Sequence, residues 1–341
     1  MSRFAFVIHP LSPKHAAKRY PVARFLPDRL IEMIMRSMRP QIISEITGIE
    51  SLTGAKTSGL FIGVPLTPSM MTDESSTEFC YSRIGEAAEL AKAEGADIIG
   101  LGAFTAVVGD GGMTIAKRSP IPVTTGNSYT VATAIDGLLK ASEQVGIVPE
   151  KATLGVIGAT GSIGKTCTMI LSELFERTIL FGRDLDRTQE VAQQATRASA
   201  SVELDDLREA DAIVTVTSAL NAIVEPRHLK PGSVICDVSR PRDVSARVAN
   251  ERPDVLVIEG GVVKVPGPVD FHFDFGFPPK TAYACMSETM MLALENRIES
   301  FTLGKDVSVD QVRETQSWAD KHGFALAGFR SFERAVTEEA I

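Results

Sequence analysis

Short apolar runs alternate with helical or loop segments through the second half of the chain, from residue 153 onward. A continuous apolar run is typical of a strand that is buried on both faces, as the strands of parallel sheets are. The alternation therefore predicts a parallel sheet with helices on both faces, made of the runs at 154–157, 178–181, 212–216, 234–236 and 255–258.

The first half of the chain predicts a second, smaller mixed sheet. An apolar run at 4–8 indicates a buried strand, and β-rich runs at 41–50 and 58–64 are joined by a short segment typical of a hairpin. Helical spacing over 72–94 ends before a glycine, as helices often do, and another helix is expected from about 129 to 145.

The first strand of the regular half leads into a glycine-rich turn. Gly158, Gly161 and Gly164 are spaced three residues apart between that strand and a helical pattern. Without Cβ atoms the backbone can turn sharply and approach a diphosphate, while free N–H groups at the helix start face the anion. The turn predicts a phosphate-bearing cofactor, bound by Gly158, Thr160, Gly161, Ser162, Ile163 and Gly164.

Two other interpretations of this turn remain open. Residues 159–166 also approach the pattern of a triphosphate-binding P-loop, with Lys165 and Thr166 in place and Asp237 as a candidate magnesium ligand. Ala159 stands where the strict P-loop motif has glycine. A glycine-rich turn between a strand and a helix can also be purely structural.

The end of the next predicted strand favours a dinucleotide, and NADP over NAD. In a dinucleotide-binding fold this strand end meets the adenosine ribose, where an acidic side chain would bind the 2′-hydroxyl group. Arg183 stands there instead, with Arg187 four residues further on, and guanidinium groups suit a 2′-phosphate. Thr217 and Ser218 follow the fourth strand, where the nicotinamide ribose would lie.

We therefore predict an α/β protein with a doubly wound Rossmann-type NADP-binding domain and a second α/β domain for the substrate. The NADP-binding domain is expected over residues 150–278, and residues 1–149 form the main part of the substrate domain. Helices over residues 279–341 are expected to pack on the substrate domain.

Composition and charge limit where the protein is expected to reside and what it is expected to bind. The 341 residues are 44% apolar, which suffices for two cores, and the four cysteines are too far apart in sequence for a disulfide framework or a metal cluster. A reducing, cytoplasmic location and no bound metal are expected. A net charge of −8 argues against nucleic-acid binding, and no apolar run is long enough for a transmembrane segment.

Positive charge nevertheless concentrates in residues 1–39, which hold eight basic and two acidic residues. Such a segment would attract an acidic partner or a phosphate, although a solvated helical face is the other interpretation. Its candidate docking residues are Lys14, Lys18, Arg19, Arg24, Arg29, Arg36 and Arg39.

Cys285 is the best candidate for a nucleophile. It lies in the first turns of a helix predicted over 281–300, where unpaired N–H groups and the helix dipole can lower the pKa of a thiol. A small buried hydrophobic residue is the competing interpretation. The positions of Cys80, Cys167 and Cys236 indicate structural roles.

An aromatic run and two histidines offer further candidates. The phenylalanines at 271, 273, 275 and 277 alternate with other residues, so they are expected to share one face. That face would be either a core strand or the wall of an apolar substrate tunnel. His272, within this run, and His9, at a strand end, are either acids or hydrogen-bonded polar groups without a chemical role.

Five motifs occur in order along the chain: GLGAFT at 100–105, TTGNSYT at 124–130, VIGATGSIG at 156–164, GGVV at 260–263 and ACMSE at 284–288. The third is common to many proteins, whereas the second, fourth and fifth are far more specific. In this order they resemble the cyanobacterial-type long-chain acyl-[acyl-carrier-protein] reductases, which form fatty aldehydes using NADPH. The resemblance covers nearly the whole chain.

The resemblance implies that Cys285 accepts the acyl group from a thioester, and that hydride from NADPH then releases an aldehyde. Acyl carrier protein or acyl-coenzyme A would be the donor, and the basic N-terminal segment would dock an acidic carrier. Tyr283 and His272 are the candidate general acids. The acyl group would contact Phe104, Thr125, Gly126, Asn127, Phe273 and Phe275.

Two other functions remain open beside this one. A dehydrogenase of the shikimate or amino-acid type would use the same cofactor without a covalent intermediate, and it would need no thiol. A protein that only binds NADP or an acyl chain would oxidise no cofactor.

Overall fold

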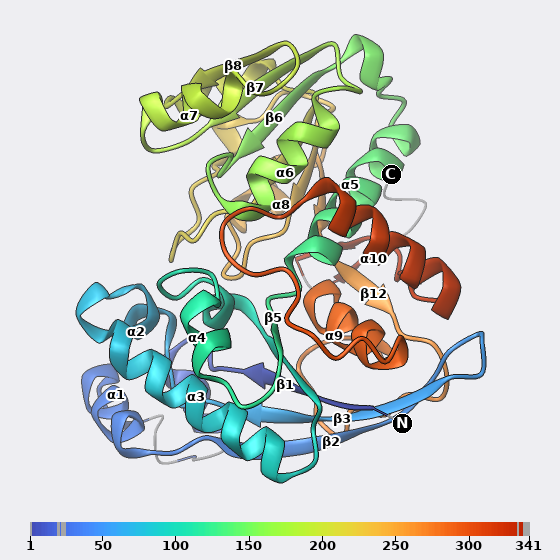
Figure 1. Ribbon diagram of the computed structural model, residues 1–341. Coiled ribbons are helices and arrows are strands. Elements are labelled where there is room, and N and C mark those ends of the chain that lie inside the picture. The colour runs from blue at the N-terminus through green and yellow to red at the C-terminus, as the bar shows by residue number, and fades with distance from the viewer. Residues whose placement is uncertain (1, 19–20, 22–24, 333, 337–341) are drawn as a thin grey trace.

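The computed structural model describes residues 2–18, 21, 25–332 and 334–336. Two sheets, each covered by helices, are stacked one above the other in Figure 1, with one long helix running between them. The class is α/β, as predicted.

Among the described residues, six parallel strands form the larger sheet, which we call the Rossmann sheet. The first strand, β6, lies in the middle, β7 and β8 extend the sheet to one side, and β9, β10 and β11 extend it to the other. This is the strand order of a dinucleotide-binding fold, in which the order reverses between β6 and β9. The strands are β6 (Thr153–Ile157), β7 (Arg177–Phe181), β8 (Ala198–Ser201), β9 (Ala212–Thr215), β10 (Val234–Asp237) and β11 (Leu256–Glu259).

Within the described ranges, five strands form the N-terminal sheet, in the order β2-β3-β1-β4-β5. β1 runs parallel to β3 and β4, and β2 pairs antiparallel with β3 through the expected hairpin. Alternate residues of β1 face opposite ways: Ala5 and Val7 pack under the α3 side, and Phe4 and Phe6 face the rest of the molecule. The strands are β1 (Arg3–Ile8), β2 (Gln41–Glu50), β3 (Lys56–Gly63), β4 (Ile98–Leu101) and β5 (Val123–Thr124).

Helices cover both sheets and connect them. The outer face of the N-terminal sheet carries α1 (Asp28–Ser37), α2 (Pro68–Thr72), α3 (Thr77–Ala93) and α4 (Met113–Arg118). The Rossmann sheet carries α6 (Ser162–Leu171), α7 (Leu185–Ala192) and α8 (Arg247–Glu251). Between the sheets lie α5 (Asn127–Gln144), α9 (Ala284–Leu294) and α10 (Val309–His322), whose apolar residues join the two lobes into one core cluster.

The C-terminal third differs from the sequence expectation. The helix expected from residue 281 begins at 284, because residues 281–283 form β13 in a small antiparallel sheet. The phenylalanine run does not form a strand, which was one of its two interpretations, and His272 and Gly276 within it adopt positive φ angles. The remaining short strands are β12 (Val262–Lys264), β13 (Thr281–Tyr283), β14 (Ala325–Leu326), β15 (Arg330–Ser331) and β16 (Arg334–Ala335).

Candidate active site

The glycine turn lies where the strand order reverses, at the carboxyl end of β6. Gly158 has a φ of +82°, and a Cβ there would lie 2.3 Å from the carbonyl oxygen of Val216 after β9. A Cβ on Gly164 would lie 2.2 Å from the carbonyl oxygen of Gly158. The fold itself therefore requires the first and third glycines, for the sharp turn and for close packing of α6.

Gly161 has no such internal reason to be glycine. Its φ is not positive, it is exposed, and the nearest atom to a Cβ would be the Gly158 carbonyl oxygen at 3.3 Å. In a dinucleotide site the second glycine keeps room for the diphosphate beside the helix start. The geometry of the turn thus fits a bound dinucleotide, with the backbone of residues 160–163 at the start of α6.

The residues of the alternative P-loop interpretation have other partners. The Lys165 ammonium group lies 3.1 Å from the Asp306 carboxylate, and the buried Thr166 hydroxyl donates to the carbonyl oxygen of Val307. Asp237 is 1% exposed and accepts hydrogen bonds from the backbone of Ser239 and Val244. All three side chains thus have partners within the protein, which disfavours the P-loop interpretation.

Arg183 and Arg187 are exposed beside the end of β7. Asp184 caps α7 by accepting the backbone N–H of Arg187, so Arg183 directly precedes the cap and Arg187 lies in the first turn of the helix. After β9, the Thr217 hydroxyl donates to Asp243, whereas Ser218 is exposed. The positions of Arg183, Arg187 and Ser218 remain compatible with the predicted cofactor contacts.

Cys285 lies at the start of α9, as expected, and is half-buried, whereas Cys80, Cys167 and Cys236 are buried. The start of α5 lies directly against it: a Cβ on Gly126 would be 2.3 Å from the Cα atom of Cys285. The next residue, Asn127, donates from its side-chain amide to the Ser162 hydroxyl at the start of α6. The starts of α5, α6 and α9 therefore converge between the two lobes, and link the glycine turn to the thiol.

The expectation of a lowered thiol pKa is wrong for the free protein. Burial raises the pKa of the Cys285 thiol to about 12, and the nearby Glu288 carboxylate acts in the same direction. Backbone N–H groups of Met286, Cys285 and Ala103 lower the pKa, but they do not outweigh desolvation. The helix start supplies the expected hydrogen-bond donors, but burial in apolar surroundings has the larger effect and raises the thiol pKa.

Sequence reasoning missed Glu288, a fully buried carboxylate one turn beyond Cys285. Its oxygens accept hydrogen bonds from the hydroxyl groups of Thr124 and Ser128 and from the backbone N–H of Tyr129 at 3.0 Å. Burial raises the pKa of the Glu288 carboxyl, and these bonds partly oppose the rise. The available signal was a lone acidic residue within an apolar helix, which indicates a buried, hydrogen-bonded group.

The other predicted residues occupy different surroundings. Tyr283 is half-buried beneath the guanidinium group of Arg240, whose central carbon lies 5.7 Å from the ring centre. His272 is exposed and lies 3.2 Å from the Thr47 hydroxyl and 3.3 Å from the Asp270 carboxylate. No hydrogen bond in the described part of the chain joins His272 to Cys285.

The aromatic run forms a packed cluster. Phe271, Phe273 and Phe275 all contact the ring of Phe61 on β3, and Phe277 continues the series to Tyr283 at a ring distance of 4.4 Å. Phe273 is 41% exposed, whereas Phe275 is half-buried. The rings therefore share a surface, as expected, but they reach it from an irregular segment.

Two further substrate candidates are buried. The Thr125 hydroxyl donates to the carbonyl oxygen of Thr302, and Phe104 packs edge-on against the His9 ring. Their side chains are 1% and 3% exposed, respectively. Both therefore support the walls of the site, and their side chains offer little surface to a ligand.

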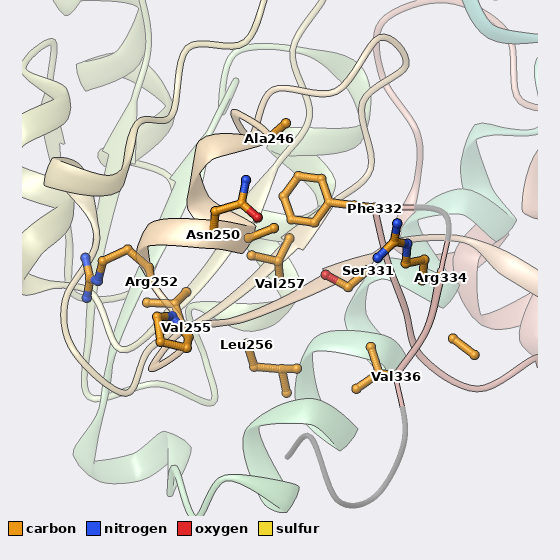
Figure 2. A pocket seen from close by; sticks show the side chains of 13 residues that line it. Ala246, Asn250, Arg252, Val255, Leu256, Val257, Ser331, Phe332, Arg334 and Val336 are labelled. Atoms are coloured by element: carbon orange, nitrogen blue, oxygen red, sulfur yellow. The ribbon is translucent and has the colours of Figure 1, made fainter.

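A cavity of about 420 Å³ lies elsewhere, between α8, β11 and the hairpin of β15 and β16. In Figure 2 the Phe332 ring and the Asn250 amide point toward it from these two sides. Its lining contains none of the predicted cofactor, catalytic or substrate residues. In the described ranges no group of His, Cys, Asp or Glu side chains is placed to hold a metal.

The basic N-terminal segment is only partly described. Arg19 and Arg24, and the side chain of Lys18, lie outside the described residues. Lys14 pairs with Asp28, and Arg36 covers the Phe79 ring, so these two charges have partners within the lobe. Arg29 and Arg39 are exposed. Among the described helices, none has both the length and the hydropathy that a membrane span needs.

A comparison with protein-family models matches the Rossmann half of the chain. The sequence model of a family described as shikimate / quinate 5-dehydrogenase matches residues 140–259, from the end of α5 to the end of β11. A solved structure, L-tryptophan dehydrogenase from Nostoc punctiforme, overlaps 94% of this chain and 80% of its own, with 12% identity and a TM-score of 0.42.

Two curated relatives extend beyond the Rossmann half. Aminotransferase PigE from Serratia sp. (strain ATCC 39006) is 28% identical over 362 residues, which cover 99% of this chain. This chain spans 41% of that protein's length. A long-chain acyl-[acyl-carrier-protein] reductase from Synechococcus elongatus (strain ATCC 33912 / PCC 7942 / FACHB-805) is 27% identical over 303 residues, covering 84% of this chain and 88% of that protein.

The two relatives are named for different activities, and the family match covers only the Rossmann half of the chain. The strand order, the glycine turn and the match to a dehydrogenase family agree on the cofactor class. Together they support an NAD(P)-dependent oxidoreductase.

Proposed function

We propose that this protein reduces an acyl thioester to an aldehyde with NADPH, through an acyl group held on Cys285. The observation that carries the proposal is the contact of Cys285 with the start of α5, which Asn127 links to the glycine turn. A covalent reductase needs a nucleophile from one lobe at the cofactor crevice of the other. The similarity to a long-chain acyl-[acyl-carrier-protein] reductase over 84% of this chain agrees with this reaction.

The residues present fit the cofactor. The backbone of residues 158–164 would hold the diphosphate beside the open Gly161, and Arg183 with Arg187 would bind a 2′-phosphate. Ser218, exposed after β9, would contact the nicotinamide ribose. The cofactor supplies the hydride in this reaction.

Cys285 performs the covalent steps. Its sulfur, deprotonated as the donor binds, attacks the thioester carbonyl carbon, and the bond from that carbon to the donor sulfur breaks. The donor sulfur takes up the proton that the Cys285 thiol has given up, so the donor leaves as a thiol. Once the acyl carbon has accepted hydride, its bond to the Cys285 sulfur breaks, which releases the aldehyde and restores the cysteine. Tyr283, next to the start of α9, and His272, beside Thr47, are the candidate sources of the protons.

The acyl chain would lie against the aromatic cluster that leads from Phe61 to Tyr283, where Phe273 and Phe275 offer apolar surface. Acyl carrier protein or acyl-coenzyme A would present this chain. An acidic carrier would meet the exposed Arg29 and Arg39 of the N-terminal lobe.

The proposal is tested by intact-mass measurement of the full chain after incubation with a pool of acyl-coenzyme A thioesters without cofactor. We expect an acyl adduct on the native protein and on a Cys80→Ala control, and none on Cys285→Ala. NADPH should then discharge the adduct as aldehyde. Aldehyde formation by Cys285→Ala at the native rate would exclude the covalent route.

One other candidate function is favoured by a specific observation. The match of residues 140–259 to the shikimate / quinate 5-dehydrogenase family favours a dehydrogenase that transfers hydride without a covalent intermediate. Such an enzyme would oxidise or reduce a small hydroxy or keto acid equally well after Cys285→Ala, and it would carry no acyl adduct.

A further inference from the structure

The starts of α5 and α6 are joined by a side-chain hydrogen bond. The amide nitrogen of Asn127, the first residue of α5, lies 3.2 Å from the hydroxyl oxygen of Ser162, the first residue of α6. Ser162 directly follows Gly161, the exposed glycine beside which a diphosphate would lie. The bond therefore reaches from the helix between the two sheets to the edge of the cofactor site.

The direction of this bond determines what the Ser162 hydroxyl can do. An amide nitrogen only donates, so the Ser162 oxygen is the acceptor and its own O–H proton remains for another acceptor. No hydrogen bond in the described ranges uses that proton. The oxygens of a diphosphate accept hydrogen bonds, and a hydroxyl that donates to such an anion forms a stronger bond than it does with a neutral group.

Glu288 fixes the start of α5, and with it Asn127. Gly126 precedes the helix and has no side chain to cap it. The buried Glu288 carboxylate caps the helix instead, because it accepts the hydroxyl of Ser128 at 2.7 Å and the backbone N–H of Tyr129 at 3.0 Å. The turn that carries Asn127 is thus held by a group from another helix.

The same turn contacts the segment that carries the thiol. Gly126 packs against the backbone of Cys285, and the next residue, Asn127, donates to Ser162. Two adjacent residues therefore join the start of α9 to the start of α6, and this close packing leaves little room for one helix to move against the other. Asn127 lies where a nucleophile and a cofactor must be held at a fixed separation.

We infer that Asn127 is a positioning residue of the cofactor site, which orients the Ser162 hydroxyl as a hydrogen-bond donor to the diphosphate of the bound dinucleotide. A hydroxyl group rotates about its C–O bond, and a hydrogen bond from a fixed amide limits this rotation before the ligand arrives. The inference deepens the cofactor half of the proposed function, on which it rests. It does not depend on acyl transfer to Cys285.

The test measures the Kd for NADPH by fluorescence titration of the full chain, without a thioester. We expect Asn127→Ala to raise the Kd about fivefold and Ser162→Ala about tenfold, since a hydrogen bond to a charged group contributes more than a neutral one. The double variant should bind no more weakly than Ser162→Ala, because Asn127 acts through that hydroxyl. Asn250→Ala, on α8 beside the separate cavity, is the matched control and should bind as the native protein does.

Asn127→Asp separates positioning from stability. A carboxylate only accepts hydrogen bonds, so it would take the Ser162 proton away from the diphosphate and add a repelling charge. We expect the Kd for NADPH to rise about tenfold or more. Urea unfolding of this variant should show a stability close to native, because an acidic side chain suits the first turn of a helix.

A native Kd in both Asn127→Ala and Asn127→Asp would overturn the inference. An equal effect of Asn127→Ala with and without the Ser162 hydroxyl would also overturn it, since Asn127 would then act without Ser162. If Asn127→Ala does not fold, Asn127→Ser replaces it, because its shorter side chain does not reach Ser162. A native protein that binds NADPH but forms no adduct with acyl-coenzyme A counts against the proposed acyl transfer alone.

Discussion

The backbone of Gly126 lies directly against that of Cys285, so that a Cβ on the glycine would overlap the Cα, Cβ and carbonyl oxygen of the cysteine. Gly126 also ends the TTG segment in the left-handed region, with a φ of +73°. This contact joins two of the motifs that carry the resemblance, at 124–130 and 284–288. The contact gives a physical reason for the two motifs to occur together, because each segment limits the space that is left for the other.

The first prediction compares two glycine variants. Gly126→Ala should destabilise the protein by about 2 to 4 kcal/mol, since the new Cβ is both strained and overlapping. Gly146→Ala, with a similar φ of +77° but nothing within 4 Å of the new Cβ, should cost about 1 kcal/mol from strain alone. Urea unfolding of both variants measures the difference. An equal loss of unfolding free energy in the two variants would mean that there is room for a Cβ between Gly126 and Cys285.

The second prediction concerns cofactor choice. Arg183→Glu should raise the KM for NADPH about 10-fold or more, because a carboxylate repels the 2′-phosphate, and should improve the use of NADH. Arg177→Gln removes a charge from the opposite end of the same strand, where Arg177 pairs with Glu209, and should leave both KM values unchanged. Steady-state kinetics with each cofactor distinguish the variants. An unchanged NADPH preference in Arg183→Glu would place the 2′-phosphate elsewhere.

The third prediction concerns the thiol. Since burial raises the pKa of Cys285 to about 12, its alkylation in the free native protein should accelerate about tenfold per pH unit between pH 7 and 10, without a plateau. Mass spectrometry of timed iodoacetamide reactions, with Cys285→Ala as control, gives the rates. A plateau near pH 8 would show that the backbone donors outweigh desolvation.

The fourth prediction concerns Glu288→Gln, which removes the buried charge and keeps the shape. Because burial raises the pKa of Glu288 in the folded protein, protonation of this group favours folding. That contribution is fully present below about pH 4.3, the ordinary glutamate pKa, and is lost as the pH rises through the folded-state value.

The free energy of unfolding of the native protein relative to Glu288→Gln should therefore fall as the pH rises from 4 to 8. Urea titrations of both proteins across this range measure the difference, in which the other ionisable groups largely cancel. A difference that grows with pH would mean that the hydrogen bonds from Thr124, Ser128 and Tyr129 lower the pKa overall.

The sequence predicted the Rossmann half well because its signals are local. The apolar runs and the glycines at 158, 161 and 164 lie within single elements, and their spacing follows from strand and helix geometry. The helix start at Cys285 was predictable for the same reason. The alternation of the aromatic run left a core strand and a tunnel wall both open, and the left-handed residues His272 and Gly276 interrupt any strand there.

The site itself depends on contacts between distant segments, which no local pattern contains. Glu288 binds a hydroxyl group 164 residues earlier in the chain, and His9 holds a loop 95 residues later. The pKa of Cys285 follows from the burial that these contacts produce, so its direction could not be read from the helix start alone. Such features become visible only when the lobes are assembled.

The long helix α5 sets a limit on how this chain can be divided. Apolar side chains of α5, such as Leu138 and Ala141, belong to a single core cluster with Phe4 of the N-terminal sheet and Leu154 of the Rossmann sheet. A protein cut after residue 149 would take α5 away with the first piece and expose that face of the second. The two lobes should therefore unfold as one cooperative unit, and neither should be obtainable as a stable fragment divided at that point.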